Sequence, residues 1–168
     1  MKPKTIRITR TCSAPPDRVL AAARDFSDRR PEIFPNVSTP LMTVHSQGDT
    51  SADVTEGTRQ GPLYAWERCD YDWSVQDSVK ATVTESNVYA VPGSSWEITA
   101  EADGTGSTVD MIWVRRFKRT PLGLLLGTMY RVAGARLFSK DVERTLRNIE
   151  AAEAPIRRAP EPDGVPGR

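Results

Sequence analysis

The apolar positions between residues 120 and 154 recur at the spacing of one long helix. A helical stripe is formed by Leu122, Leu126, Met129, Ala133, Phe138, Val142, Leu146 and Ile149. Thr120 has a side-chain oxygen suited to an N-cap, and Pro121 fits the first helical position. The next proline is Pro155, so we predict that the helix continues to about Ala154. A helix of this length requires a large apolar partner, which the rest of the chain must provide.

Shorter segments before this helix alternate between apolar and polar residues, as strands do. In the first of them, residues 4–12, Ile6 and Ile8 stand between polar neighbours. Strand character recurs in six more segments, at residues 41–47, 51–60, 63–73, 78–87, 94–102 and 107–117. The connections between these six segments contain turn-forming residues and are too short for crossover helices, which favours antiparallel pairing.

Two short helices are predicted between the first strand and the second. The first begins near Pro15 and places on one face Val19, Ala22, Ala23 and Phe26. The second is a helix or turn within residues 27–35. This order predicts an α+β fold, in which a curved seven-stranded antiparallel sheet wraps around the long C-terminal helix. We expect one domain over residues 1–154 and a disordered, proline-rich tail over residues 155–168.

Composition adds few constraints to this picture. The 168 residues are 38% hydrophobic and 27% charged, which suits one domain with a core and a solvated surface. The net charge of +1 gives no reason to expect nucleic acid as a partner. The N-terminus has no signal-peptide pattern and the apolar run 122–127 is too short to span a bilayer. We therefore expect a cytoplasmic protein, with Cys12 and Cys69 as free thiols. Because His45 is the only histidine, we expect no metal, and we expect no other cofactor.

A family resemblance rests on the order of these elements and on three segments. They are RPEIFPN at 30–36, GTGSTVDMIWVRRF at 104–117 and the long final helix. Together they resemble the START-like (SRPBCC, helix-grip) superfamily, and within it the bacterial polyketide cyclase/dehydrase and lipid-transport branch. The resemblance covers about residues 4–153. It implies a helix-grip fold with an apolar ligand held in a cavity between sheet and helix; some members are enzymes, and many only bind or carry.

Strand periodicity indicates which residues would face such a cavity. On the 63–73 strand, one face carries Leu63, Ala65, Glu67, Cys69 and Tyr71. The other face carries Tyr64, Trp66, Arg68, Asp70 and Asp72. Composition slightly favours burial of the first face, but alignment with the family pattern favours the second, which we adopt. The predicted ligand-binding residues are therefore Tyr64, Trp66, Arg68, Asp70, Trp96 and Trp113. Simple core packing is an equal alternative for each tryptophan.

Arg68 and Asp70 have a functional and a structural interpretation. In the first, Arg68 anchors a carbonyl, carboxylate or enolate oxygen and Asp70 orients it. In the second, they are a solvated pair on one strand face. In the aromatase/cyclases that this chain resembles, an arginine on this strand helps to polarise the substrate. Our alignment places Asp70 at that point, so we assign no catalytic residue.

Three functions remain open at this stage. The chain is a module that binds or carries a lipid-like or polyketide-like molecule, a cyclase or dehydratase without metal or nucleotide, or a protein-interaction module with a filled interior. The sequence specifies neither the ligand nor the oligomeric state. Arg115, Arg116 and Arg119 precede the apolar helix start at 121–126, which suggests weak peripheral membrane contact. The alternative is a charged strand end followed by a buried helix start.

Overall fold

The computed structural model describes residues 2–60 and 63–152, which form one sheet and three α-helices. The strands are β1 (Lys4–Cys12), β2 (Thr43–Gln47), β3 (Ser51–Gln60), β4 (Leu63–Asp72), β5 (Ser78–Ser86), β6 (Ser95–Asp103) and β7 (Gly106–Arg115). The helices are α1 (Pro16–Ala23), α2 (Arg30–Ile33) and α3 (Pro121–Ala151). The predicted domain end at residue 154 and the predicted tail, residues 155–168, lie outside the described residues.

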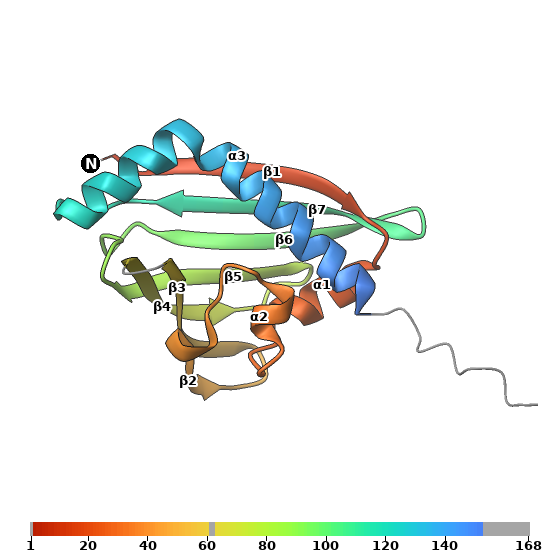
Figure 1. Cartoon of the computed structure of the whole chain (residues 1–168). Coiled ribbons are helices and arrows are strands. Elements are labelled where there is room, and N and C mark those ends of the chain that lie inside the picture. The colour runs from red at the N-terminus through yellow and green to blue at the C-terminus, as the bar shows by residue number, and fades with distance from the viewer. Residues whose placement is uncertain (1, 61–62, 153–168) are drawn as a thin grey trace, which may run out of the picture.

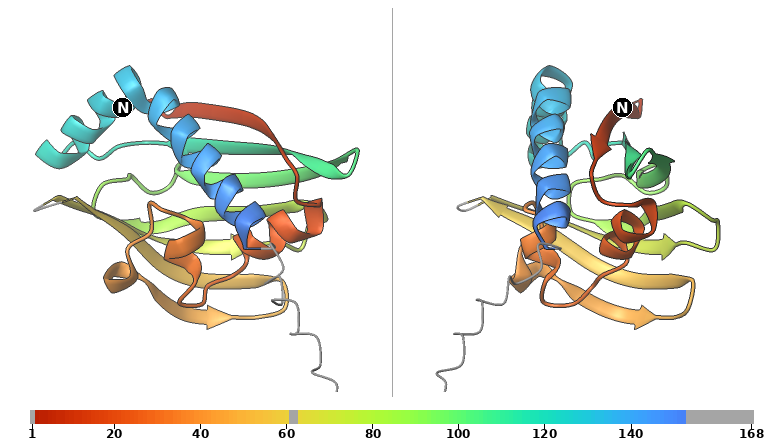
Figure 2. Two further views of the ribbon diagram at one scale, coloured as in Figure 1. Left: turned by 45° about the vertical axis from the view of Figure 1, so that its right-hand side comes forward. Right: turned by 90° about the vertical axis from the view of Figure 1, so that its right-hand side faces the viewer.

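The seven strands form a single antiparallel sheet in the order β1-β7-β6-β5-β4-β3-β2. The sheet curves, and α3 runs across its concave face (Figure 1). The edge-on view in Figure 2 shows α3 as a separate layer, with α1 and α2 beside its C-terminal end. The predicted α+β helix-grip fold is confirmed. The strand predicted from residue 41 starts at Thr43, because the segment Thr39–Leu41 around Pro40 forms a 3₁₀ turn.

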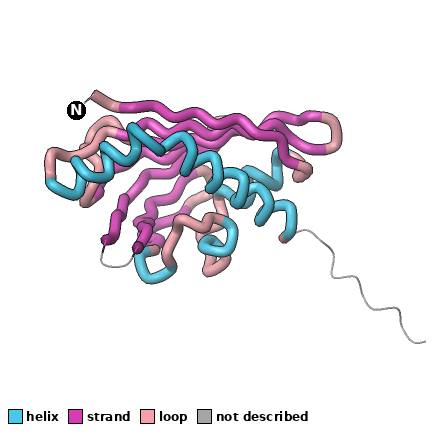
Figure 3. Tube along the Cα trace, turned by 45° about the horizontal axis from the view of Figure 1, so that its top comes forward, coloured by secondary structure: helices cyan, strands magenta, loops and turns pink. Residues whose placement is uncertain are grey.

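The two halves of α3 are buried to different extents. At its start, the Thr120 hydroxyl accepts a hydrogen bond from the backbone N–H of Gly123 at 3.2 Å, as the N-cap prediction required. The C-terminal half buries Val142, Leu146 and Ile149, in agreement with the predicted stripe. In the N-terminal half, Met129 of the same stripe is 48% exposed, so its predicted burial is wrong. The helix therefore covers the sheet tightly at one end and loosely at the other. Figure 3 shows the path of α3 across one face of the sheet.

The sheet buries the residues that its alternation predicts on most strands. Alternate residues of β6 and β7 are buried, including Trp96, Ile98, Ala100, Val109, Met111 and Trp113. Helix α3 approaches β1 closely at Gly134, where an added Cβ would lie 2.9 Å from Cδ1 of Ile6. The absence of a side chain at Gly134 thus permits the short distance between the helix and the edge of the sheet.

The inward face of β4 is the opposite of the one adopted from the sequence. Cys69 and Tyr71 are each 1% exposed, whereas Tyr64 is 50% exposed and Asp70 lies in solvent. The apolar side chains determine which face of β4 is buried, because a shift of the strand by one residue would turn Cys69 and Tyr71 towards solvent. The pairing of β4 with β5 also shifts register between Arg68 and Cys69. The extra residue is Thr84 on β5, and the alternation along β4 itself is unbroken.

Candidate functional site

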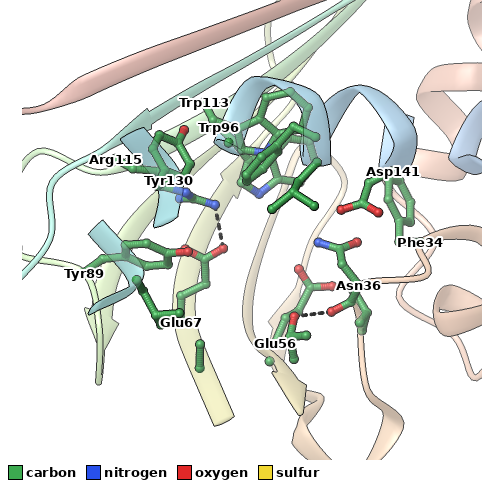
Figure 4. Close-up of a pocket in the computed structure, with 18 of the residues that line it drawn as sticks. Phe34, Asn36, Glu56, Glu67, Tyr89, Trp96, Trp113, Arg115, Tyr130 and Asp141 are labelled. Atoms are coloured by element: carbon green, nitrogen blue, oxygen red, sulfur yellow. Dashed lines mark hydrogen bonds and ion pairs between the residues drawn. The ribbon is translucent and has the colours of Figure 1, made fainter. Parts of the chain in front are cut away.

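A cavity of about 450 Å³ lies between the concave face of the sheet, residues 122–145 of α3 and the segment that follows α2 (Figure 4). Most of its wall is aromatic or aliphatic. Apolar lining residues include Phe34, Trp96, Met111, Trp113, Phe117, Leu122, Leu126 and Phe138. The rings are packed edge to face, for example Trp113 and Phe138, whose centroids are 4.7 Å apart. Such a wall suits an apolar ligand body better than a polar one.

The mouth of the cavity lies along the exposed part of α3. Met129 and Leu137 line the cavity, and each is 48% exposed. Tyr64, at the start of β4, also lines it and is half exposed. Residues that are both lining and exposed mark a rim, so the opening runs between α3 and the β3–β4 end of the sheet.

The sequence-predicted site residues divide into two groups. Trp96 and Trp113 are buried in the cavity wall, and Tyr64 and Trp66 also contribute to it. Their contact with a ligand stays a prediction. Arg68 and Asp70 are absent from the lining residues that the structure describes.

Arg68 instead belongs to an ion-pair group on the outer face of the sheet. Its Nε and Nη2 donate to the two carboxylate oxygens of Asp53 at 2.8 and 2.6 Å, and Nη1 donates to Glu85 at 3.2 Å. The solvated-pair interpretation of this strand face therefore fits Arg68, although its partners are Asp53 and Glu85 rather than Asp70. The proposed role of Arg68 as an oxygen anchor in the cavity is not supported by its position.

A buried ion pair at one end of the cavity joins β7 to β4. Arg115 is 4% exposed, and its Nη2 donates to Oε1 of Glu67 at 2.9 Å. Its guanidinium carbon lies 4.5 Å from the centroid of the Tyr89 ring, a cation–π contact. The hydroxyl of Tyr130, on α3, is buried at the same end. The suggested membrane contact through Arg115 is therefore wrong, because this side chain points into the protein.

A second buried ion pair joins α2 to β3. Arg30 is 1% exposed, and its guanidinium donates to both carboxylate oxygens of Glu56. Tyr71 donates its hydroxyl to Glu56, and Arg30 also donates to the carbonyls of Ala23 and Asp25 at 3.0 and 3.2 Å. Arg30 thereby ties the end of α1, the start of α2 and the sheet together.

The sequence analysis identified neither ion pair, although the sequence did indicate that Arg115 faces inward. The alternation of β7 placed Arg115 on the same face as Trp113 and Phe117, which are both buried. Glu56 and Glu67 give no such signal, because charged residues in a strand usually face solvent. They become neighbours only through the sheet register, in which Glu56 is the cross-strand partner of Glu67.

The pattern of one protein family covers nearly the whole described chain. The family described as polyketide cyclase / dehydrase and lipid transport matches residues 3–152. The chain belongs to this family. No curated protein matches the chain.

Several solved structures have the same fold as this chain. TTHA0849 from Thermus thermophilus is 14% identical, with a TM-score of 0.73 over 90% of this chain and 100% of its own. The Zhui aromatase/cyclase from Streptomyces sp. R1128 is 14% identical, with a TM-score of 0.71 over 88% and 94%. A START superfamily protein from Mycobacterium smegmatis is 9% identical, with a TM-score of 0.63 over 88% and 95%. At these identities the likeness shows the fold alone.

In this family domain, the cavity places titratable groups in surroundings that disfavour charge. Burial raises the pKa of Glu67, and the nearby Arg115 only partly opposes this effect. Burial likewise raises the pKa of the Tyr130 hydroxyl and of Asp141, which lies on α3 at the other end of the cavity. The described residues contain no group of acidic, cysteine and histidine side chains that could hold a metal ion. No helix within residues 2–60 and 63–152 is long and apolar enough to cross a membrane.

Proposed function

We propose that this START/polyketide-cyclase-type ligand-binding domain binds or carries a hydrophobic small molecule, lipid-like or polyketide-like, in the cavity under α3. One observation carries the proposal: an aromatic-lined space of about 450 Å³ that opens along the exposed half of the helix. This volume lies within the range of small-molecule sites, which are usually concave, apolar and few per protein. An interaction module with a filled interior fits this space poorly.

A catalytic role receives less support. The printed name of the Zhui aromatase/cyclase describes an enzyme of this fold, but fold does not determine activity. In this chain Arg68, the residue that the sequence suggested for binding a substrate oxygen, pairs with Asp53 and Glu85 away from the cavity. Binding or carriage is therefore the function that the geometry favours.

The test is saturable binding of a neutral apolar dye, N-phenyl-1-naphthylamine, followed by its fluorescence. Leu126→Trp should weaken binding at least tenfold, because Leu126 lines the cavity and the larger ring fills part of it. Leu124→Trp is the matched control, since Leu124 is half exposed on the same helix and is not among the lining residues. Absence of saturable binding to the wild-type protein, or equal effects of the two variants, would overturn the proposal.

A second proposal concerns where the ligand enters: the start of α3 docks on an anionic membrane surface. Leu124, Leu125 and Met129 are about half exposed beside the exposed Arg116 and Arg119. No acidic residue occurs between residues 115 and 139, so every charged side chain in this half of the helix is basic. Each basic residue close to an anionic surface contributes about 1 kcal/mol of attraction.

Liposome co-sedimentation tests this docking surface. The wild-type protein should bind phosphatidylcholine/phosphatidylglycerol vesicles and not pure phosphatidylcholine vesicles, and rising salt should weaken binding. Arg116→Glu/Arg119→Glu should abolish it, whereas Arg144→Glu/Arg147→Glu, the same charge change at exposed positions near the other end of α3, should not. Equal loss in both variants would show a net-charge effect and contradict a specific docking surface.

A further inference from the structure

The polar end of the cavity formed by Glu67, Tyr89, Arg115 and Tyr130 draws on four separate parts of the chain. Glu67 comes from β4, Tyr89 from the β5–β6 connection, Arg115 from the end of β7 and Tyr130 from α3. Figure 4 shows these side chains gathered at one side of the cavity, with Trp96 and Trp113 between them and the opposite end. A ligand with an apolar body against the tryptophans would bring one of its ends to this cluster.

The cluster retains hydrogen-bonding capacity that the described residues leave unused. Arg115 has five N–H donors, and the contact to Glu67 comes from Nη2 alone. Its Nε and Nη1, the Oε2 atom of Glu67 and the hydroxyl of Tyr130 are buried and have no partner within the described protein. Buried polar groups in native proteins are almost always hydrogen-bonded, so such a concentration at a cavity wall points to a polar ligand atom.

Three of the four unused groups, Nε and Nη1 of Arg115 and the Tyr130 hydroxyl, can donate, so they favour a hydrogen-bond acceptor. Arg115 offers only donors, and Tyr130 can donate its hydroxyl proton, whereas a carbonyl oxygen has two lone pairs and no proton. Burial raises the pKa of the Tyr130 hydroxyl, so this group stays a donor at neutral pH. A carbonyl oxygen between Arg115 and Tyr130 would satisfy donors from both side chains.

The local charge favours a neutral acceptor over a carboxylate. Arg115 is already balanced by Glu67, and the cross-strand neighbour of Glu67 is a second buried acid, Glu56, which is itself balanced by Arg30. A ligand carboxylate would add an uncompensated negative charge beside these two acids in a site shielded from water. Like charges in such surroundings are strongly disfavoured.

We infer that Arg115, Glu67 and Tyr130 form a specificity subsite for the neutral carbonyl oxygen of an otherwise apolar ligand, and that the subsite discriminates against carboxylates. This inference rests on the proposed binding function and adds to it the chemical class of the ligand. Arg115 and Tyr130 donate to the oxygen, while Glu67 holds the guanidinium in place and opposes a second anion.

Three naphthalene derivatives of similar size test the subsite by displacement of N-phenyl-1-naphthylamine. We expect 2-acetylnaphthalene to bind about tenfold more tightly than 2-naphthoate, and also more tightly than 2-ethylnaphthalene, which has no oxygen. Tyr130→Phe should reduce the affinity for the ketone about threefold to tenfold and leave that for the ethyl compound unchanged. Thr128→Val is the control, because it also removes a hydroxyl from α3, at an exposed position that is not among the lining residues.

The variant Tyr130→Phe removes only a hydroxyl without a protein partner, so it should fold like the wild-type protein. Arg115→Met/Glu67→Leu removes both charges together and gives a second measurement: it should reduce the preference for 2-acetylnaphthalene over 2-ethylnaphthalene, because the Arg115 donors to the carbonyl oxygen are lost. If the dye binds and the three ligands compete equally, or if Tyr130→Phe changes nothing, the subsite is refuted and the proposed function stands. If neither dye nor ligands bind, the proposed function fails, and the subsite fails with it.

Discussion

The two buried arginine–glutamate pairs are built from the same residue types but differ in how completely their hydrogen bonds are satisfied. Glu56 accepts from Arg30 and from Tyr71, and Arg30 also donates to two backbone carbonyls. Glu67 accepts from Arg115 through one oxygen, and atoms of both side chains have no partner in the described chain. The first arrangement is what stability requires, because a buried charge is tolerated when it is paired and fully hydrogen-bonded. The second has the character of a binding site.

The largest expected effect is a difference in stability between variants of the two buried arginines. Arg30→Met should destabilise the fold by about 3–5 kcal/mol, because it leaves Glu56 buried without its cation and releases the carbonyls at the end of α1. Arg115→Met should cost about 1–3 kcal/mol, since it removes one hydrogen bond and Glu67, whose pKa is already raised by burial, can take up a proton. Urea unfolding measures both free energies.

The exposed Arg29 provides a control for these measurements. Arg29→Met should change the free energy of unfolding by no more than about 0.5 kcal/mol, because surface substitutions rarely do more. A loss for Arg115→Met that equals or exceeds the loss for Arg30→Met would contradict the distinction between a structural pair and a ligand-facing pair.

A smaller difference is expected between the two tyrosine hydroxyls. Tyr71→Phe should cost about 1–3 kcal/mol, because a carboxylate oxygen of Glu56 loses its hydroxyl donor inside the protein. Tyr130→Phe should leave stability within about 0.5 kcal/mol of the wild type, since its hydroxyl has no protein partner to lose. Thermal unfolding followed by circular dichroism is sufficient, and a marked loss in Tyr130→Phe would reveal a structural role for that hydroxyl.

The smallest effect is a pH dependence carried by Glu67. Because burial raises the pKa of Glu67, the folded state holds a proton that the unfolded state has released above a pKa of about 4.3. The resulting stabilisation is present below that pH and is lost as the pH rises through the folded-state pKa. Glu67→Gln does not titrate, so the stability of the wild-type protein relative to this variant should decline from pH 4 to pH 7.

The size of this decline in relative stability is limited, and a change in the other direction would contradict the prediction. One proton can change the free energy of unfolding by at most about 1.4 kcal/mol per pH unit. Unfolding in urea at one-unit intervals of pH measures the difference between the two proteins. A relative stability that rises with pH would mean that Arg115 outweighs burial, and that the Arg115–Glu67 pair resembles Arg30–Glu56 after all.

The helix and the sheet could be predicted because their determinants are local in the sequence. Thr120, Pro121 and the apolar stripe specify where α3 begins and which face of its second half is buried. Alternation likewise identified Trp96 and Trp113 as inward residues. Met129 was misplaced because the stripe continues past the point where the sheet stops covering the helix.

The candidate site was harder to predict because it depends on register between strands distant in sequence. Glu56 and Glu67 meet only through the pairing of β3 with β4. The facing of β4 was inverted because the alignment with the family pattern was preferred to the composition of the two faces. Arg115 shows a different difficulty. The alternation of the strand predicted that Arg115 faces inward, but the basic residues next to it in the sequence suggested that it lies on the protein surface.

The uneven burial of α3 links occupancy of the cavity to local order in the chain. The C-terminal half of this helix is anchored by Val142, Leu146 and Ile149, while the N-terminal half has fewer buried side chains and is the part expected to open first. A ligand touching Leu126 and Phe138 favours the closed helix by mass action. Backbone amide hydrogen exchange near residues 122–138 should therefore slow when the cavity is filled, so that the wall of the binding site itself reports whether the protein is loaded.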